Sequence, residues 1–357
     1  MPIPRPDLSQ ADPAILDYIA ALEAELARLY ALQDANDRSH LARRQPEAPP
    51  EPSEPPTTLN IVTISAGGLV KRSPRHLYQR QRRGGMGVFD LETPDRDRPA
   101  FLALADAAAG LLLLTSRGRA FRLPLGSLAE APVRSRGQAS GDFLSLLVDE
   151  RLICALPADG GSYLALVSER GQVRRYSAHL FGEAMRPGAA VFDPAYGGEP
   201  AAACWTTGDD DLFIVTRAGL AIRFAERQVP VRGVLGIRLE RDDRVAAMTA
   251  VKDDAGVFLL GADGRGALRQ MAGFRPHKEP GAGGKTAMKT DALVGAVTVG
   301  ADDELFLLSR LSKIIRFAAA EVPAKDGVVQ GVNCMELRSD ETVAVIASRG
   351  SAAAIPR

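Results

Sequence analysis

The chain has 357 residues, of which 46% are hydrophobic and 25% charged, and its formal net charge is zero. This composition is ordinary for a soluble globular protein and excludes a disordered chain. No apolar stretch reaches the roughly 18 residues of a transmembrane helix, and the amino-terminal MPIPRPDLSQ lacks the apolar centre of a secretory signal. The three cysteines and four histidines are scattered without metal-ligand spacing, so we expect a cytoplasmic protein without metal or cofactor.

Charge is distributed unevenly along the chain. Residues 1–57 hold five Lys or Arg against ten Asp or Glu, residues 58–140 hold thirteen against six, and residues 141–357 hold twenty-six against twenty-eight. A local basic surplus of this kind is typical of a protein that binds a polyanion with part of its surface.

Residues 1–45 are predicted to contain an amphipathic helix. Asp12 and Pro13 suit the start of a helix, and the apolar residues that follow are spaced alternately by four and three: Ile15, Ile19, Leu22, Leu26 and Leu29. A short coiled coil would bury this seam and make a homo-oligomer through residues 13–33. Packing of the helix on its own chain would bury it equally well. Residues 46–57 are a proline-rich acidic linker, which favours a helix that stands apart.

One phrase then recurs six times, about every 50 residues. Each copy is an apolar run, a tight turn and a second apolar run that carries a basic residue. The turn residues are Gly68, Gly118, Gly171, Gly219, Gly264 and Ser312. Short runs of Val, Ile, Leu and Phe around a glycine predict a β-hairpin, and a fixed period predicts an array of equivalent units.

Four residues after five of the six turn positions stands an arginine: Arg72, Arg122, Arg175, Arg223 and Arg316. The fifth repeat has Leu268 there, followed by Arg269. Two interpretations remain open. The arginines form a basic track on the surface, or they are exposed edge charges that discourage aggregation.

A second, glycine-containing segment follows each hairpin and leads into another apolar strand. Four strands in each of six units predict an all-β fold, a six-bladed β-propeller closed into a ring. We place the propeller at residues 58–350, with blades at about 58–108, 109–160, 161–208, 209–253, 254–301 and 302–350, and a tail at 351–357. We expect residues 59–64 and 343–347 to meet where the ring closes.

The first of these segments, Gln81–Gly87 (QRRGGMG), resembles the basic box of the carboxy-terminal domain of bacterial DNA gyrase A. Six of the seven positions match, and Met86 stands where the family has a base. The hairpin phrase, GAGGKTAMK (281–289) and IIRFAAAEVPAKDGVVQGV (314–332) resemble family repeats in order. The resemblance covers residues 58–350 and implies a β-pinwheel, whose blades exchange strands, with double-stranded DNA bent around its basic rim.

The resemblance implies a set of DNA-binding residues. In the box, Arg82 and Arg83 would hold the DNA backbone, while Gly84, Gly85 and Gly87 would let the main chain approach phosphates. Gln81 would bind a phosphate or brace the loop. The remaining candidates are basic residues of the first two blades and, further round the ring, of the last two: Lys71, Arg72, Arg75, Arg80, Arg119, Arg122, Arg134, Arg136, Lys285, Lys289, Lys313, Arg316 and Lys325.

Two functions follow as hypotheses. The first is a non-catalytic, nucleoid-associated protein that binds double-stranded DNA without sequence preference and bends or partly wraps it on the basic outer rim, chiefly on the first two blades. It would act alone or beside a topoisomerase, because 57 residues leave no room for a breakage-reunion domain before the first blade. The second is a propeller scaffold for protein partners with a degenerate DNA track. The sequence shows no phosphate loop, metal cluster or nucleophile–base set that would indicate an enzyme.

Overall fold

The structure is a computed structural model that describes residues 12–42, 54–94, 97–142 and 144–349. It contains two compact units, residues 1–51 and residues 52–357. In the first unit, helix α1 spans Pro13–Ala42, and the Asp12 carboxylate accepts a hydrogen bond from the Ala14 N–H at 2.8 Å, as its predicted cap should. The seam residues Ile15, Leu22 and Leu26 are exposed. No helix among the described residues is long and apolar enough to span a membrane.

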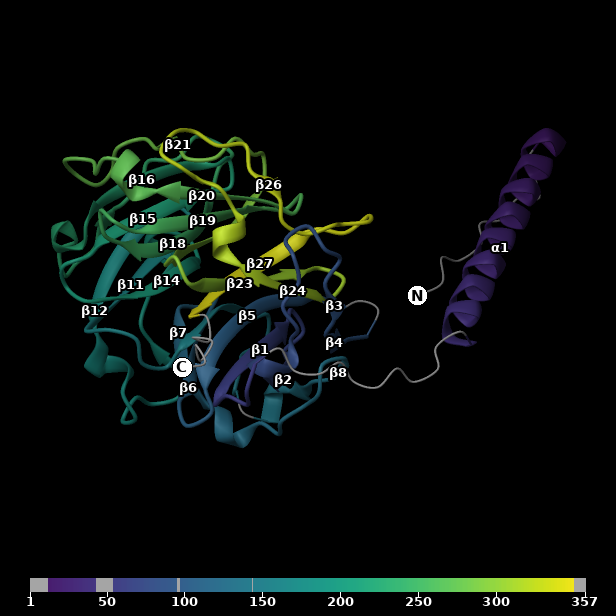
Figure 1. The fold of residues 1–357 in the computed structure, drawn as a ribbon, viewed down its shortest axis with the longest axis horizontal. Coiled ribbons are helices and arrows are strands. Elements are labelled where there is room, and N and C mark those ends of the chain that lie inside the picture. The colour runs from purple at the N-terminus through teal and green to yellow at the C-terminus, as the bar shows by residue number, and fades with distance from the viewer. Residues whose placement is uncertain (1–11, 43–53, 95–96, 143, 350–357) are drawn as a thin grey trace, which may run out of the picture. The chain divides into compact units, whose positions relative to one another are not determined.

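The second unit is the predicted six-bladed propeller (Figure 1). Each blade is a sheet whose strands run, from the innermost to the outermost, in the same order. Blades 1 to 3 are β5 (Pro99–Asp106), β1 (Leu59–Ser65), β2 (Leu69–Pro74) and β9 (Gln138–Ala139); β10 (Leu152–Pro157), β6 (Gly110–Thr115), β7 (Arg119–Pro124) and β13 (Ala189–Ala190); and β14 (Pro200–Thr206), β11 (Tyr163–Ser168), β12 (Gln172–Ser177) and β17 (Val234–Leu235).

Blades 4 to 6 follow the same order. They are β18 (Val245–Val251), β15 (Asp211–Thr216), β16 (Leu220–Ala225) and β21 (Lys285–Thr286); β22 (Leu293–Val299), β19 (Gly256–Gly261), β20 (Arg265–Gln270) and β26 (Val332–Asn333), with β25 (Ala324–Lys325) parallel to β20; and β27 (Thr342–Arg349), β23 (Asp303–Ser309), β24 (Lys313–Ala318) and β3 (Val88–Phe89). Strand β4 (Leu91–Glu92), directly after β3 of blade 6, pairs in parallel with β8 (Ser135–Arg136), directly before β9 of blade 1.

The predicted hairpins are all present. Gly68 has a φ of +88°, which a glycine adopts without steric cost. Ser312 adopts a φ of +66° in the sixth hairpin, and its hydroxyl donates to Leu91 O at 2.7 Å and accepts from Leu91 N at 2.8 Å. These bonds to the first repeat account for a serine at a position where the other repeats have glycine.

The outermost strand of each blade comes from the following repeat. Gln138–Ala139 of the second repeat pairs with β2 of blade 1, and Val88–Phe89 of the first repeat pairs with β24 of blade 6. The latter pairing closes the ring by hydrogen bonds, whereas Ile61 and Val343, from the two segments expected to meet there, share a hydrophobic cluster at the same junction. Strand β27 pairs with β23 and packs against β5, the innermost strand of blade 1.

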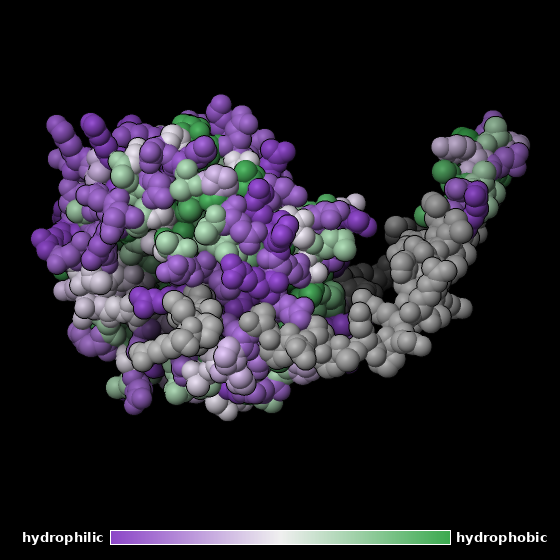
Figure 2. All heavy atoms as spheres, viewed as in Figure 1, coloured by the Kyte–Doolittle hydropathy of each residue, from purple (hydrophilic) through white to green (hydrophobic). Residues whose placement is uncertain are grey.

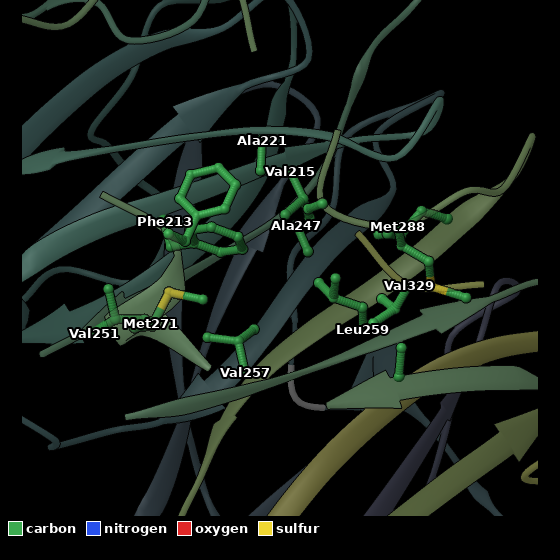
Figure 3. Packing of buried hydrophobic residues seen from close by; sticks show 14 residues of the cluster. Phe213, Val215, Ala221, Ala247, Val251, Val257, Leu259, Met271, Met288 and Val329 are labelled. Carbon is green, nitrogen blue, oxygen red and sulfur yellow. The ribbon is translucent and has the colours of Figure 1, made fainter. Parts of the chain in front are cut away.

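A short 3-10 turn follows each hairpin: η1 (Arg75–Leu77), η2 (Leu125–Ser127), η4 (Ala178–Phe181), η6 (Glu226–Gln228), η7 (Met271–Gly273) and η8 (Ala319–Glu321). In η2, η7 and η8 the first residue, Leu125, Met271 or Ala319, packs into the core between two blades. Figure 3 shows this for blades 4 and 5, where Met271 lies with Phe213, Val257 and Leu259 in one buried cluster. The hydrophobic core is therefore a ring of such clusters between neighbouring sheets.

Candidate nucleic-acid interface

The arginine repeated in the hairpins lies between blades. In five blades its guanidinium reaches the 3-10 turn of the next blade or a carboxylate on that turn. Arg72 Nη1 donates to Leu125 O at 2.8 Å, Arg122 Nη1 to Phe181 O at 2.5 Å, Arg175 Nη1 to Glu226 Oε2 at 3.2 Å, Arg223 Nη1 to Met271 O at 2.9 Å, and Arg316 Nη1 to Tyr78 O at 2.9 Å. We call these five residues the interblade arginines.

Carboxylates neutralise the most buried interblade arginines. Arg223, 1% exposed, pairs with Asp211 at 2.8 Å and Asp253 at 2.5 Å. Arg316, 2% exposed, pairs with Glu304 at 2.5 Å and Glu54 at 2.7 Å. Both sequence-based interpretations need an exposed side chain, and the burial of Arg223 and Arg316 contradicts that requirement. These arginines join neighbouring blades instead.

Two other expected DNA contacts are buried as well. Lys71 Nζ is 2.5 Å from Asp90 Oδ1, and neither side chain is exposed. Burial lowers the pKa of Lys71, although the Asp90 charge opposes that shift. Arg75 is 3% exposed and bonds Glu54 and the Ser348 hydroxyl. Neither side chain can reach a phosphate, so the expectation that they bind DNA needs correction.

Three further candidates are engaged to different degrees. Arg119 is half-buried, with Nη1 2.6 Å from Glu150 Oε2. Arg80 is exposed, with Nε 3.8 Å from Glu304 Oε1. Lys313 is half-buried at the ring closure, where its main chain lies opposite that of Phe89 in the pairing of β24 with β3. Arg119 and Lys313 are therefore partly enclosed, whereas the side chain of Arg80 stays on the surface.

The basic box, Gln81–Gly87, lies where the ring closes. Gly84 N donates to Cys334 O at 2.8 Å, Gly85 N to Arg82 O at 3.3 Å, and Gln81 N to Arg316 O at 2.7 Å. These three N–H groups are already bonded within the protein, so they are not available to phosphates. Gly87 has a φ of +71°, and a Cβ on it would lie 2.7 Å from Ile314 O.

The two box arginines differ in their contacts. Arg83 is exposed, but Nε donates to Glu321 O at 2.9 Å and Nη1 to Asn333 O at 3.0 Å, which binds the first repeat to the sixth. Arg82 is exposed and makes no ion pair among the described residues. Met86, which replaces the expected base, is 44% exposed. Among the described residues, Arg82 is thus the box arginine whose guanidinium is not held by the protein.

Each segment that supplies an outermost strand carries at least one exposed basic side chain without an ion pair to a described residue. Arg83 is left out because backbone carbonyls hold its guanidinium, and we call seven of the others the rim bases: Arg82, Arg134, Arg186, Arg232, Lys285, Lys289 and Lys325. Arg136 is also exposed, with Nε 4.0 Å from Glu92 Oε2. The sequence predicts the glycine-containing segments that hold Arg186 and Arg232, but these two arginines are not among its candidate DNA-binding residues. Both follow a hairpin at the position that the basic box has in the first repeat, and this position could have identified them.

Four parts of the chain, residues 59–98, 111–138, 210–252 and 303–348, match the family described as DNA gyrase C-terminal domain, beta-propeller. The propeller is thus similar to the gyrase A carboxy-terminal domain. The propeller has the fold of a solved DNA gyrase A C-terminal domain, with a TM-score of 0.70 at 21% identity over 80% of this chain and 98% of that one. It also has the fold of the C-terminal domain of DNA topoisomerase IV, with a TM-score of 0.58 at 20% identity over 82% and 94%.

Curated relatives show the same similarity. The chain is 28% identical over 303 residues to DNA gyrase A of Mycolicibacterium smegmatis, which is 80% of this chain and 36% of the relative. It is 29% identical over 303 residues to DNA gyrase A of Mycobacterium tuberculosis, with the same two shares. The chain thus spans about a third of the length of these relatives.

Proposed function

We propose that this protein binds double-stranded DNA through the rim bases. The observation that carries the proposal is the recurrence, in every segment that supplies an outermost strand, of an exposed base without an ion pair to any described residue. Lysine and arginine side chains at such positions neutralise phosphates and release counterions, which gives affinity without sequence preference. We leave the buried Lys71, Arg75 and Arg316 out of the interface.

The proposed path differs from the one that the sequence favours. The basic surplus of residues 58–140 includes buried and paired charges, such as Lys71 with Asp90 and Arg119 with Glu150. Free bases are instead spread over all six repeats, at roughly one per repeat. This distribution supports contacts along much of the rim. Bending 20–30 bp by 40–90° costs on the order of 1–6 kcal/mol, so several rim bases must act together.

The surface chemistry supports a polar partner. Figure 2 shows one face of the molecule, on which hydrophilic side chains cover most of the propeller and hydrophobic ones occur in small groups. Single exposed apolar residues are normal on soluble proteins. We infer a non-catalytic, nucleoid-associated role, alone or as an accessory to a topoisomerase.

Salt-dependent DNA binding tests the proposal. The variant Arg82→Gln/Arg134→Gln/Lys289→Gln should bind a duplex more weakly and lower the slope of log K against log [salt] by about 2–3, since each lost phosphate contact removes about 0.9. The matched control is Arg170→Gln/Arg217→Gln/Lys252→Gln, which removes three exposed bases outside the rim segments. Equal effects of the two variants would refute a rim interface, and absent binding at low salt would refute the function.

Ligation of nicked circles with the protein then reports bending or wrapping as a change in linking number.

A second candidate function is a scaffold for protein partners. The observation that favours it is the exposed seam of α1, formed by Ile15, Leu22 and Leu26. We propose that this seam forms a short coiled coil between two copies of the chain. Sedimentation of the full chain tests this, because Leu22→Lys/Leu26→Lys should convert a dimer into a monomer. A monomeric wild-type protein would refute it.

A further inference from the structure

The junction between blades 5 and 6 has no interblade arginine. Leu268 occupies the position of Arg223 and Arg316 in its hairpin, opposite Phe258 just as Arg223 is opposite Phe213. Where the guanidinium would lie, the structure has a cavity of about 380 Å³. This volume is within the range of small-ligand pockets.

The cavity coincides with the place that Arg223 fills at the preceding junction. Arg223 bonds Met271 O, Phe274 O, Asp211 and Asp253. One repeat later, the equivalent positions are Ala319, Val322, Gly256 and Ala301. All four line the cavity, together with Leu268. The cavity is therefore the arginine site of a regular junction without its arginine, and we call it the vacant arginine site.

The small residues at this junction create the space. A Cβ on Gly256 would lie 3.0 Å from Leu268 Cδ1, so the leucine covers the position where blade 4 has the Asp211 carboxylate. At the regular junction, Met271 O accepts from both Phe274 N and Arg223 Nη1. Ala319 O accepts from Val322 N at 3.0 Å. A carbonyl oxygen has two lone pairs, so Ala319 O retains one for a further donor.

The charge at the vacant arginine site suits a cation. The lining includes Asp254, which is exposed and has no ion-pair partner among the described residues. Gly256, Leu268 and Val299 supply an apolar wall against which an aliphatic stem can pack. A side chain with an alkyl stem and a planar, multiply donating head matches this combination, and arginine has both.

We propose that the vacant arginine site binds the side chain of an arginine residue presented by a protein partner. The partner's guanidinium takes the place of the interblade arginine, donates to Ala319 O and pairs with Asp254. Its stem lies against Leu268. The site involves no rim base, so the proposal is independent of DNA binding.

Titration of the full-length protein with N-acetyl-L-arginine methylamide tests the proposal. Methyl resonances of Leu268, Val299 and Val322 should shift and saturate. The citrulline analogue has nearly the same shape without the charge, and we expect it to bind about two- to fivefold more weakly, because the ion pair with Asp254 is partly exposed. Absence of saturable shifts, or equal binding of the two compounds, would overturn the proposal.

Two variants locate the site. Leu268→Arg/Ala301→Asp rebuilds a regular junction, so it should fold, and the arginine probe should no longer shift Val299 or Val322. Asp254→Asn leaves the cavity open and should reduce the preference for arginine over citrulline to about one. If the first variant fails to fold, the second still decides. Persistent binding to the rebuilt junction, or an unchanged preference in Asp254→Asn, would show that the probe binds elsewhere.

Discussion

Glu54 Oε2 accepts a hydrogen bond from Arg316 Nη2 at 2.7 Å, which joins the segment before blade 1 to the last blade. The same carboxylate accepts from Arg75 Nη2 at 2.8 Å, and Arg75 Nη1 donates to the Ser348 hydroxyl at 2.6 Å. One buried glutamate thus connects both ends of the propeller where its ring closes. In the sequence, Glu54 is only one acid of a proline-rich linker.

Glu54→Gln should destabilise the propeller. The substitution keeps the shape of the side chain but leaves Arg75 and Arg316 short of one negative charge in a buried place. Breaking a buried pair in this way costs about 3–5 kcal/mol. Chemical denaturation measures the loss. Glu183→Gln is the matched control, because Glu183 is exposed and unpaired among the described residues, and it should change stability by less than about 0.5 kcal/mol. Equal effects would contradict the assigned role of Glu54.

Acid should weaken the ring closure through the same residue. Burial raises the pKa of Glu54, but the hydrogen bonds and charges of Arg316 and Arg75 outweigh it and hold the pKa below the ordinary 4.5. A lowered folded-state pKa means that the unfolded chain binds the proton more readily. The stabilisation is therefore complete above about pH 4.5 and is lost as the pH falls through the folded-state pKa. The stability difference between wild type and Glu54→Gln should shrink over that range. A difference that stays constant would contradict this assignment.

Arg223→Leu copies at blade 4 the natural substitution found at Leu268. It removes the hydrogen bond to Met271 O and leaves Asp211 and Asp253 without their cation. We expect a loss of about 2–4 kcal/mol in the free energy of unfolding, less than for a fully enclosed pair because Asp253 is largely exposed. Arg232→Leu serves as the control and should lie within about 0.5 kcal/mol of wild type. A neutral Arg223→Leu would show that the interblade arginines do not stabilise the ring.

Met86→Arg should strengthen DNA binding. It restores the base that the family's box carries, on a side chain that is 44% exposed beside Arg82. One additional phosphate contact should raise the salt slope by about 0.9. Val148→Arg adds the same charge at an 81% exposed site outside the rim segments and should leave the slope unchanged. Fluorescence anisotropy at several salt concentrations measures both, and an equal gain would indicate non-specific attraction.

Gly87→Ala should destabilise the protein without any change in charge. Its φ of +71° disfavours a side chain, and the added Cβ would lie 2.7 Å from Ile314 O at the ring closure. We expect a loss of about 1–3 kcal/mol in thermal or chemical denaturation. Gly141→Ala meets no atom within 4 Å and is the control. If Gly87→Ala keeps full stability but loses DNA binding, the glycine contacts DNA and does not close the ring.

The sequence by itself determined the repeated hairpins, their number and the all-β propeller. This was possible because a hairpin depends on local chemistry: apolar strands and a residue such as Gly68 that tolerates positive φ. The family resemblance added the exchange of strands and the place of the basic box. The helix start at Asp12 was equally local, and its cap is confirmed.

Only the tertiary structure decided which charges are free. Arg82 and Arg316 are both arginines in repeated segments, yet one is exposed and the other is 2% exposed between two carboxylates. The partners of Arg316 are Glu304 and Glu54, and Glu54 lies 262 positions away in the chain. Charge in a sequence is counted residue by residue, whereas exposure and pairing depend on neighbours that only the closed ring brings together.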